Sequence, residues 1–301
     1  MIDIAIIGAG PSGLTAAIYA ARAGYDVTIF EKNFSGGQMN FTNEIENFPG
    51  FEKISGSELS IKMEGQAKSL GVKFKNIEIK LIKKENDLFK IATSNDEFIA
   101  KKVIISLGAT SRTLGIESEE KFRGMGVSYC ATCDGGFFKN RNVAVIGGGN
   151  TAFEDAVYLS NICKKVYIIH RKNSFRADKI LQEEAKSIDN IEFIYSSEVD
   201  EIEGDTEVNA LKLKNTQNNN ITQIQVDGVF IAIGIKPNSE LVEGLVEKDE
   251  EGYIITDVNM RTSLSGMYAV GDVRNTSLRQ IITACADGAI AINDIVMRNN
   301  E

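Results

Sequence analysis

The chain has 301 residues, and at about 150 residues per domain this length favours two domains. Hydrophobic residues make up 43% and charged residues 25%, which is typical of a globular protein and excludes disordered and collagen-like chains. The net charge of -9 would repel a phosphate backbone, so we expect no nucleic-acid partner.

The first residues, MIDIAIIGAG, contain neither the basic region nor the cleavage site of a signal peptide. No apolar run in the sequence approaches the length of a membrane span. We therefore expect a cytoplasmic protein that does not associate with a membrane. In a reducing compartment, a pair among the four cysteines is more often catalytic or metal-binding than structural.

One segment of the chain occurs twice. Residues 4–31 read IAIIGAGPSGLTAAIYAARAGYDVTIFE, and residues 143–170 read VAVIGGGNTAFEDAVYLSNICKKVYIIH, at a constant offset without a gap. Each copy predicts a strand, a glycine-rich turn, a helix and a second strand, which is a βαβ unit of a parallel sheet. Two further buried strands, VIISLG at 103–108 and VFIAIG at 229–234, resemble each other and close each half.

Both copies carry the glycine fingerprint of a dinucleotide-binding turn. The fingerprint residues are Gly8, Gly10 and Gly13 in the first copy and Gly147 and Gly149 in the second. The first two glycines of such a motif permit a tight turn and close approach to a pyrophosphate, while the third position permits helix–strand packing. The alternative, that the glycines serve packing only, explains the third position but not the first two. Two nucleotide sites are therefore predicted.

The residue that ends the second strand of such a unit faces the adenosine ribose. Glu31 holds this position in the first copy, where an acid accepts hydrogen bonds from the ribose hydroxyls and repels a 2′-phosphate, which favours FAD or NAD. In the second copy a cationic cluster favours a phosphate and predicts NADPH. The cluster consists of His170, Arg171, Lys172 and Arg176. The alternative for this cluster is a solvated, charged surface.

Two dinucleotides in one chain imply electron transfer between them. A nicotinamide that reduces a flavin is the usual pairing, and the sequence has no haem or iron–sulfur spacing. We therefore expect FAD in the first unit and NADPH in the second.

The chain is predicted to form nested domains. The polar residues 110–114 and the proline-containing stretch 235–238 are candidate hinges. We expect residues 1–109 and 237–301 to form a discontinuous FAD-binding domain. An NADPH-binding domain of residues 115–234 would be inserted into it.

The expected fold class is α/β, with two nested Rossmann-like, doubly wound domains of the three-layer ββα type, the second inserted into the first. Alternating patterns at 75–101 and 192–226 predict small antiparallel sheets beside the parallel ones.

The motif CATC at 130–133, just before the second fingerprint, has three interpretations. A zinc site needs four ligands, yet Cys163 and Cys285 are isolated in apolar segments that suit the core. Structural thiols are the second interpretation. A redox dithiol is favoured, because a two-residue spacer lets both sulfurs close into a disulfide and lowers the pKa of one thiol.

Next to a flavin, a dithiol of Cys130 and Cys133 would complete a relay from nicotinamide to flavin to disulfide. The leaving thiolate needs a proton donor, and the single histidine, His170, is already placed at the nucleotide. Asp134 is therefore the candidate acid, if burial against the flavin raises its pKa. Its alternative role is to cap the turn that follows. We expect no metal.

Over nearly its whole length the sequence resembles the low-molecular-weight thioredoxin reductase family. Seven motifs occur in that family's order and spacing. They are GAGPSG at 8–13, SGGQ at 35–38, ENFPG at 46–50, YCATCDG at 129–135, GGGNTA at 147–152, HRKNSFRA at 170–177, and GDV…RQI at 271–281.

The resemblance implies residues for each cofactor. For FAD it implies Gly8, Gly10, Ser12, Gly13, Glu31, Lys32, Gly37, Gln38, Asn47, Asp272, Arg279, Gln280 and Ile281. For NADPH it implies Gly147, Gly149, Asn150, Thr151, His170, Arg171, Lys172 and Arg176. It also implies that Cys133 faces the flavin, that Cys130 attacks the thioredoxin disulfide, and that the protein is a homodimer. The inserted domain would swing about its two hinges between half-reactions.

The family's usual HRR is HRK here, and Lys172 keeps the positive charge but loses the bidentate hydrogen bonding of arginine. The leading prediction is an NADPH-dependent thioredoxin reductase. The enzymatic alternatives are a ferredoxin-dependent flavin thioredoxin reductase, a flavin dithiol oxidase, and the flavoprotein component of an alkyl hydroperoxide reductase. A nucleotide-sensing module without turnover is the alternative outside enzymes.

Overall fold

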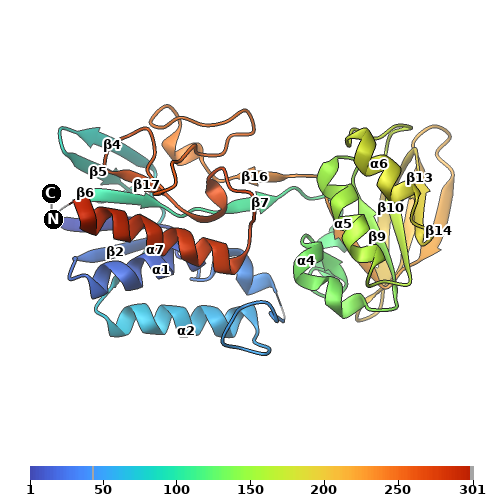
Figure 1. Cartoon of the computed structure of the whole chain (residues 1–301), viewed down its shortest axis with the longest axis horizontal. Helices are drawn as coiled ribbons and strands as arrows, with labels where there is room; N and C mark the ends of the chain where they lie inside the picture. Colours follow the sequence, from blue (N-terminus) through green and yellow to red (C-terminus); the bar gives the residue numbers. More distant parts are fainter. Residues whose placement is uncertain (43, 299–301) are drawn as a thin grey trace. The chain divides into compact units, whose positions relative to one another are not determined.

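The computed structural model describes residues 1–42 and 44–298 of the chain (Figure 1). The chain folds into two compact units, the first made of Met1–Thr110 with Lys236–Glu301 and the second of Ser111–Ile235. Each unit contains a sheet with a parallel core and with helices packed on it. The predicted α/β class with two Rossmann-like units is therefore confirmed.

The first unit is built on a seven-stranded sheet. Its strands are β1 (Ile2–Ile7), β2 (Val27–Glu31), β3 (Lys73–Asn76), β4 (Leu81–Glu85), β5 (Leu88–Ala92), β6 (Glu97–Ile105) and β17 (Met267–Ala269). The order is β3-β2-β1-β6-β5-β4, and β17 also pairs with β6. β4 and β5 are antiparallel, and β5 is antiparallel to β6, so the hairpin predicted within 75–101 extends the main sheet instead of forming a separate one.

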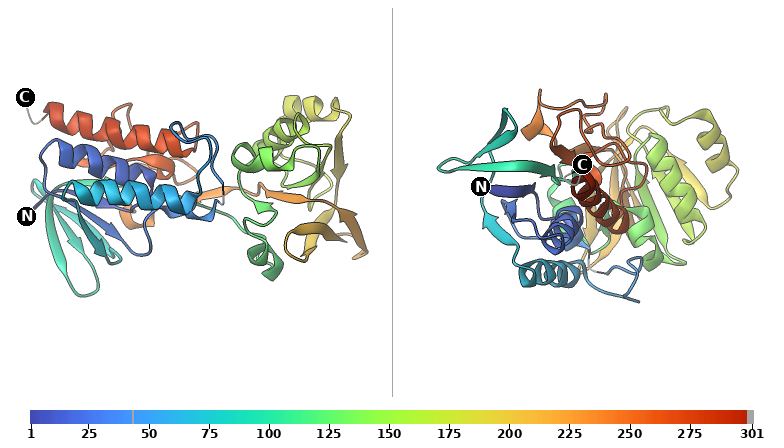
Figure 2. Two further views of the ribbon diagram at one scale, coloured as in Figure 1. Left: turned by 90° about the horizontal axis from the view of Figure 1, so that it is seen from below. Right: turned by 60° about the vertical axis from the view of Figure 1, so that its left-hand side comes forward.

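Helices and short turns of the first unit surround this sheet. They are α1 (Pro11–Arg22), α2 (Gly56–Ser69), α7 (Ile281–Arg298), and the 3-10 turns η1 (Gly37–Phe41), η3 (Glu240–Val242) and η4 (Gly271–Val273). Figure 2 shows α1, α2 and α7 together on one face of the sheet. α1 and α7 approach closely at Gly288, where a Cβ would lie 2.3 Å from the carbonyl oxygen of Ser12.

Successive residues of β1 serve opposite faces of the sheet, as the two-residue period of a strand requires. Ile4 and Ile6 belong to the apolar cluster beneath the helices. Ala5 and Ile7 belong to the cluster on the other face, under the β4–β5 hairpin and the segment around η3. The uninterrupted apolar sequence of β1 thus reflects a strand buried on both sides.

The second unit repeats this design with a five-stranded parallel sheet. Its strands are β8 (Val127–Ser128), β9 (Asn142–Ile146), β10 (Lys165–Ile169), β11 (Ile191–Ile194) and β15 (Gly228–Ile231), in the order β11-β10-β9-β15-β8. Three more strands, β12 (Ser197–Gly204), β13 (Val208–Asn215) and β14 (Ile221–Gln225), form the antiparallel sheet predicted within 192–226. The helices are α3 (Glu117–Lys121), α4 (Ala131–Asp134), α5 (Asn150–Ser160), α6 (Lys179–Lys186) and the 3-10 turn η2 (Gly135–Phe138).

The connections between the units are paired strands. β7 (Ala109–Ser111) and β16 (Ile235–Pro237) form a two-stranded sheet at the positions where hinges were predicted. On one side of it the Asn238 amide N–H donates to the carbonyl of Gly108, 3.0 Å away. On the other side the Arg112 N–H donates to the carbonyl of Gly234 at 2.9 Å. In the described parts of the chain, no helix combines the length and apolarity needed to cross a membrane.

Candidate functional site

The glycines of the first turn fall into two kinds. Gly8 has φ +105°, and a Cβ there would lie 2.3 Å from the carbonyl oxygen of Ser106. A Cβ at Gly13 would lie 2.1 Å from the carbonyl oxygen of Gly8, so both positions are closed by the protein's own backbone. At Gly10, the N-cap of α1, a Cβ would meet nothing within 4 Å. Only this glycine leaves room at the helix N-terminus, where an anion is stabilised by free N–H groups.

The carboxylate of Glu31 lies beside the same turn. It accepts hydrogen bonds from the Ala9 N–H and the Asn33 N–H, both at 2.9 Å. Ser12 is 5% exposed, and its hydroxyl lies 2.7 Å from that of Ser106. The Ser12 side chain therefore holds α1 against the end of β6, while Glu31 marks the end of β2 as the sequence predicted.

Of the other residues predicted for the first nucleotide site, Gly37 lies near this turn, while Gln38, Asn47 and Gln280 make contacts of their own. A Cβ built on Gly37 would lie 3.6 Å from the Gly10 Cα. The Gln38 side chain donates to the carbonyl of Ala109 at 3.1 Å. Asn47 donates to the side-chain oxygen of Gln280 at 3.1 Å. Lys32 is exposed, and no hydrogen bond is found that draws its side chain toward this group within the described residues.

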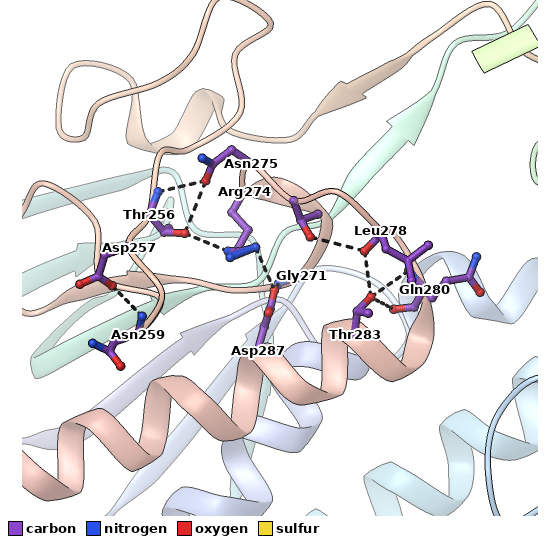
Figure 3. A network of polar contacts seen from close by, with 11 residues as sticks. Thr256, Asp257, Asn259, Gly271, Arg274, Asn275, Leu278, Gln280, Thr283 and Asp287 are labelled. Atoms are coloured by element: carbon purple, nitrogen blue, oxygen red, sulfur yellow. Dashed lines mark hydrogen bonds and ion pairs between the residues drawn. The ribbon is translucent and has the colours of Figure 1, made fainter. Parts of the chain in front are cut away.

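The segment from η4 to α7 contributes a polar network, shown in Figure 3. The Asp287 carboxylate accepts from the Gly271 N–H at 3.0 Å and lies 3.7 Å from the Arg274 guanidinium. Arg274 also donates to the Thr256 hydroxyl at 2.9 Å. The network fixes the backbone on either side of Asp272.

Asp272 and Arg279 are the charged groups of this segment predicted to meet FAD. Burial raises the pKa of Asp272 to about 6, although the Arg279 cation acts in the opposite direction. The Arg279 guanidinium lies 4.3 Å from the ring centre of Tyr253, which is 4% exposed. The buried Nε of Arg279 has no hydrogen-bond partner among the described residues. Ile281, which was also predicted for this site, begins α7, is partly buried and packs against the core of the first unit.

The second turn reproduces the first. A Cβ at Gly147 would lie 2.4 Å from the carbonyl oxygen of Ala232, whereas a Cβ at Gly149, the N-cap of α5, would meet nothing within 4 Å. Asn150 is bound to Asp178 by two hydrogen bonds of 2.9 Å, which tie the start of α5 to the start of α6. Thr151 is exposed on the first turn of α5.

His170 is the buried member of the basic cluster. It is 8% exposed and stacks on Phe175 at 5.4 Å between ring centres, and a Cβ on Gly148 would lie 2.5 Å from its ring. Burial lowers the pKa of His170, and the nearby cations Arg176, Arg171 and Lys172 lower it further. Its Nε2 atom is buried and lacks a hydrogen-bond partner within the part of the chain that is described.

Arg171, Lys172 and Arg176 surround this imidazole with exposed cations. The backbone N–H of Arg176 donates to the carbonyl of Gly148 at 2.7 Å, so the cluster is tied to the glycine turn itself. The arrangement combines an open helix N-terminus, three cations and an imidazole nitrogen for which the described residues supply no partner. These are the groups that a phosphorylated nucleotide requires.

Cys130 and Cys133 form a disulfide. Cys130 is the N-cap residue of the short helix α4, and both cysteines are partly exposed. Burial raises the pKa of Asp134 at the end of this helix, while a hydrogen bond from Ser128 opposes the shift. The two cysteines thus share a short helix with a carboxyl group whose pKa is raised.

The other cysteines do not take part in this pair. Cys163 is buried, and its burial raises the thiol pKa to about 11. Cys285 packs against the core of the first unit, and burial raises its pKa as well. Among the described residues, no group of three or more His, Cys, Asp or Glu side chains has an arrangement that would hold a metal.

A buried carboxylate that no sequence motif selects supports the segment before the disulfide. Glu119 is 2% exposed and accepts from the backbone N–H groups of Leu114 and Gly115 at 2.8 and 3.1 Å. It also accepts from the hydroxyl of Tyr129 at 2.6 Å. Burial and this hydrogen bond raise the pKa of Tyr129 to about 12, so the phenol remains a donor. Tyr129 directly precedes Cys130.

Comparisons with known proteins agree with this geometry. The model of the pyridine nucleotide-disulphide oxidoreductase family matches residues 2–288. A thioredoxin reductase of Listeria innocua is 45% identical over 96% of this chain and 91% of its own length. The Bacillus subtilis thioredoxin reductase is 42% identical over 97% of this chain and 93% of its own.

Solved structures give the same result. The crystal structure of thioredoxin reductase from Streptococcus pyogenes MGAS5005 matches with a TM-score of 0.97 and 44% identity, covering 100% of this chain and 98% of that one. Thioredoxin reductase from Giardia duodenalis matches with a TM-score of 0.94 and 34% identity, covering 100% and 99%. The chain belongs to the pyridine nucleotide-disulphide oxidoreductase family and, within it, to the low-molecular-weight thioredoxin reductases.

Proposed function

We propose that the chain is an NADPH-dependent flavoprotein that reduces the disulfide of thioredoxin. Electrons pass from NADPH to FAD, then to the Cys130–Cys133 disulfide, and finally to thioredoxin. The observation that carries this proposal is that disulfide, which shares α4 with the partly buried acid Asp134 in a unit that also contains a nucleotide-type turn. The curated relatives named thioredoxin reductase support the same activity.

The residues of the first unit fit FAD. Gly10 leaves room for a pyrophosphate at the start of α1, and Glu31 offers carboxylate oxygens for ribose hydroxyls. Asp272 and Arg279 are partly buried charged groups on the segment that approaches the same turn at Gly271, where a Cβ would lie 2.7 Å from the Ser12 Oγ. The Arg279 Nε lacks a partner among the described residues. When bound, the flavin accepts hydride from the nicotinamide and delivers two electrons to a disulfide.

The residues of the second unit fit NADPH. Gly149 leaves space for the pyrophosphate, and the cations Arg171, Lys172 and Arg176 supply positive charge for a 2′-phosphate. The buried Nε2 atom of His170, which has no partner among the described residues, can form a hydrogen bond with the ligand. Lys172 lacks the bidentate fork of arginine but keeps its positive charge, and we therefore expect a preference for NADPH over NADH to persist.

The dithiol transfers electrons by exchange. The thiolate of Cys130 attacks one sulfur of the thioredoxin disulfide, and the thiolate displaced from thioredoxin takes a proton. The thiolate of Cys133 then attacks the mixed disulfide, which restores the Cys130–Cys133 disulfide and releases the second thiol of thioredoxin. Two electrons leave the dithiol in this sequence, and Asp134 supplies a proton to a departing thiolate.

The remaining assignments follow from the family. We propose that residues 1–109 with 237–301 bind FAD, that residues 115–234 bind NADPH, and that the connections at 110–114 and 235–238 act as hinges. We further propose a cytoplasmic homodimer, which light scattering coupled to size-exclusion chromatography would test. A monomer at micromolar concentration would contradict the dimer.

Anaerobic titration tests the electron path. NADPH should bleach the yellow flavin faster than NADH does, and oxidised thioredoxin should restore the colour. Cys133→Ser should leave flavin reduction by NADPH intact but abolish turnover with thioredoxin, while the control Cys163→Ala should retain both. Turnover by Cys133→Ser would refute the role of the dithiol. Reoxidation by oxygen at the same rate with and without thioredoxin would favour a dithiol oxidase instead.

A further inference from the structure

We propose that Ser128 is a positioning residue for thiol–disulfide exchange, because its hydroxyl pairs with Asp134 in both protonation states of that acid. The proposal rests on the redox role of Cys130 and Cys133 given above and deepens it. It concerns how the proton reaches the reaction, which neither the motif nor the family relationship assigns.

Ser128 is held in place by the sheet. It is the last residue of β8, it lies opposite Phe230 of β15, and it is 5% exposed. Its Oγ accepts a hydrogen bond from the Cys130 N–H at 3.1 Å. The same Oγ lies 2.6 Å from an Asp134 oxygen, to which it donates. One hydroxyl therefore joins both ends of α4, the helix that carries the disulfide.

This hydroxyl has two acceptors for its single hydrogen. The Asp134 carboxylate lies at 2.6 Å and the Cys130 carbonyl oxygen at 3.3 Å. While Asp134 is ionised it can only accept, so the hydroxyl points at the carboxylate. When Asp134 is protonated, its own O–H can donate to the Ser128 Oγ, and the Ser128 hydrogen can turn to the Cys130 carbonyl. Rotation about one C–O bond accommodates both states without moving a heavy atom.

The charges around Asp134 leave Ser128 as its main polar partner. α4 packs against η2 and α5 and follows β8. η2 and β8 carry no titratable side chain, and those of α5 are Glu154, Asp155 and Tyr158. None of these three shifts the pKa of Asp134, which burial raises and Ser128 lowers. Removal of the Ser128 hydroxyl should therefore raise the pKa of Asp134 further.

The transferred proton balances in this scheme. Protonated Asp134 gives its proton to the departing thiolate, and the carboxylate that remains then accepts a hydrogen bond from Ser128, which keeps its own proton. A lost hydrogen bond to a charged group costs about 1.5–3 kcal/mol. We therefore expect Ser128→Ala to slow exchange with thioredoxin by about tenfold or more.

The test compares Ser128→Ala with three other variants of the flavin-loaded enzyme. Stopped-flow mixing would follow oxidation by thioredoxin from pH 5 to 9, and flavin reduction by NADPH would be measured separately. Ser128→Ala should lower the maximal rate of exchange and move its alkaline decline to higher pH. Ser128→Thr, which keeps the hydroxyl, should restore both. Ser197→Ala removes another buried hydroxyl of the same unit, bound to the Tyr195 carbonyl, and should change neither.

A spectroscopic readout independent of turnover accompanies the kinetics. Infrared difference titration should show the protonated carboxyl band of Asp134 persisting to higher pH in Ser128→Ala, and the band should be absent in Asp134→Asn. An unchanged pH profile and band in Ser128→Ala would overturn the proposal, as would equal slowing of flavin reduction by NADPH. If Asp134→Asn exchanged at the full rate, the proposed acid itself would be wrong.

Discussion

Gly149→Ala separates the room that the second turn leaves for a pyrophosphate from the stability of that turn. Gly149 caps α5 with φ -103° and ψ 180°, a conformation open to any residue, and a Cβ there would meet nothing within 4 Å. We expect the free energy of unfolding to change by about 1 kcal/mol or less, as for Gly and Ala at a helix N-cap.

Ligand binding should respond much more strongly than stability. The added methyl group stands where the backbone has to approach the pyrophosphate of a dinucleotide. A hydrogen bond to a charged group contributes about 1.5–3 kcal/mol. Loss of one such bond would weaken the binding of NADP⁺ by about 10- to 150-fold.

Isothermal titration of the flavin-loaded protein with two ligands measures this difference. NADP⁺ contains the pyrophosphate, whereas 2′-AMP contains only the phosphate that the basic cluster is predicted to bind. Gly149→Ala should weaken the binding of NADP⁺ and leave the affinity for 2′-AMP unchanged. The control Gly136→Ala, another open glycine of the same unit, should affect neither. An unchanged affinity for NADP⁺, or an equal loss for both ligands, would refute the assigned turn.

Further variants test the first turn and two acidic residues. Gly13→Ala should prevent the first unit from folding stably, because its Cβ would lie 2.1 Å from the Gly8 carbonyl oxygen. Gly10→Ala should fold but fail to retain FAD, because a Cβ there meets no protein atom within 4 Å. Thermal melting and flavin content distinguish the two variants. Burial raises the pKa of Asp155 to about 7, so the folded state holds its proton more tightly than the unfolded chain does. The free energy of unfolding that this proton contributes is lost as the pH rises through 7. Relative to the wild type, the free energy of unfolding of Asp155→Asn should therefore increase by on the order of 2 kcal/mol between pH 5 and pH 8. A difference in urea unfolding that does not depend on pH would contradict this. Glu119→Ala leaves three donors without their acceptor and should cost about 3 kcal/mol or more in urea unfolding, with a smaller loss for Glu119→Gln.

The nucleotide turns could be predicted from the sequence because their requirements are local. A strand, a glycine turn and a helix follow one another within thirty residues or so, and the repeat places Gly10 and Gly149 at matching positions. The structure adds a distinction that the motif does not contain. Within each fingerprint, one glycine faces open space while Gly8, Gly13 and Gly147 face backbone or packed atoms.

Other contacts could not be predicted because they join residues that only the folded chain brings together. Tyr253 meets the Arg279 guanidinium, and Glu119 meets Tyr129, without any spacing rule that selects them. The hairpin within 75–101 was correctly expected to be antiparallel, but alternation does not say which strand it will pair with. Its place at the end of the main sheet follows from the length of β6, whose first residues extend past β1.

The buried Glu119 carboxylate has a practical consequence for dissecting the protein. Two of its three donors are the backbone amides of Leu114 and Gly115, which lie at the very start of the second unit. In a recombinant fragment that begins after Gly115, the buried Glu119 carboxylate would keep only the Tyr129 hydroxyl of its three hydrogen-bond donors. Fragments intended for isolated study of the cysteine-bearing half should therefore start no later than Ser111.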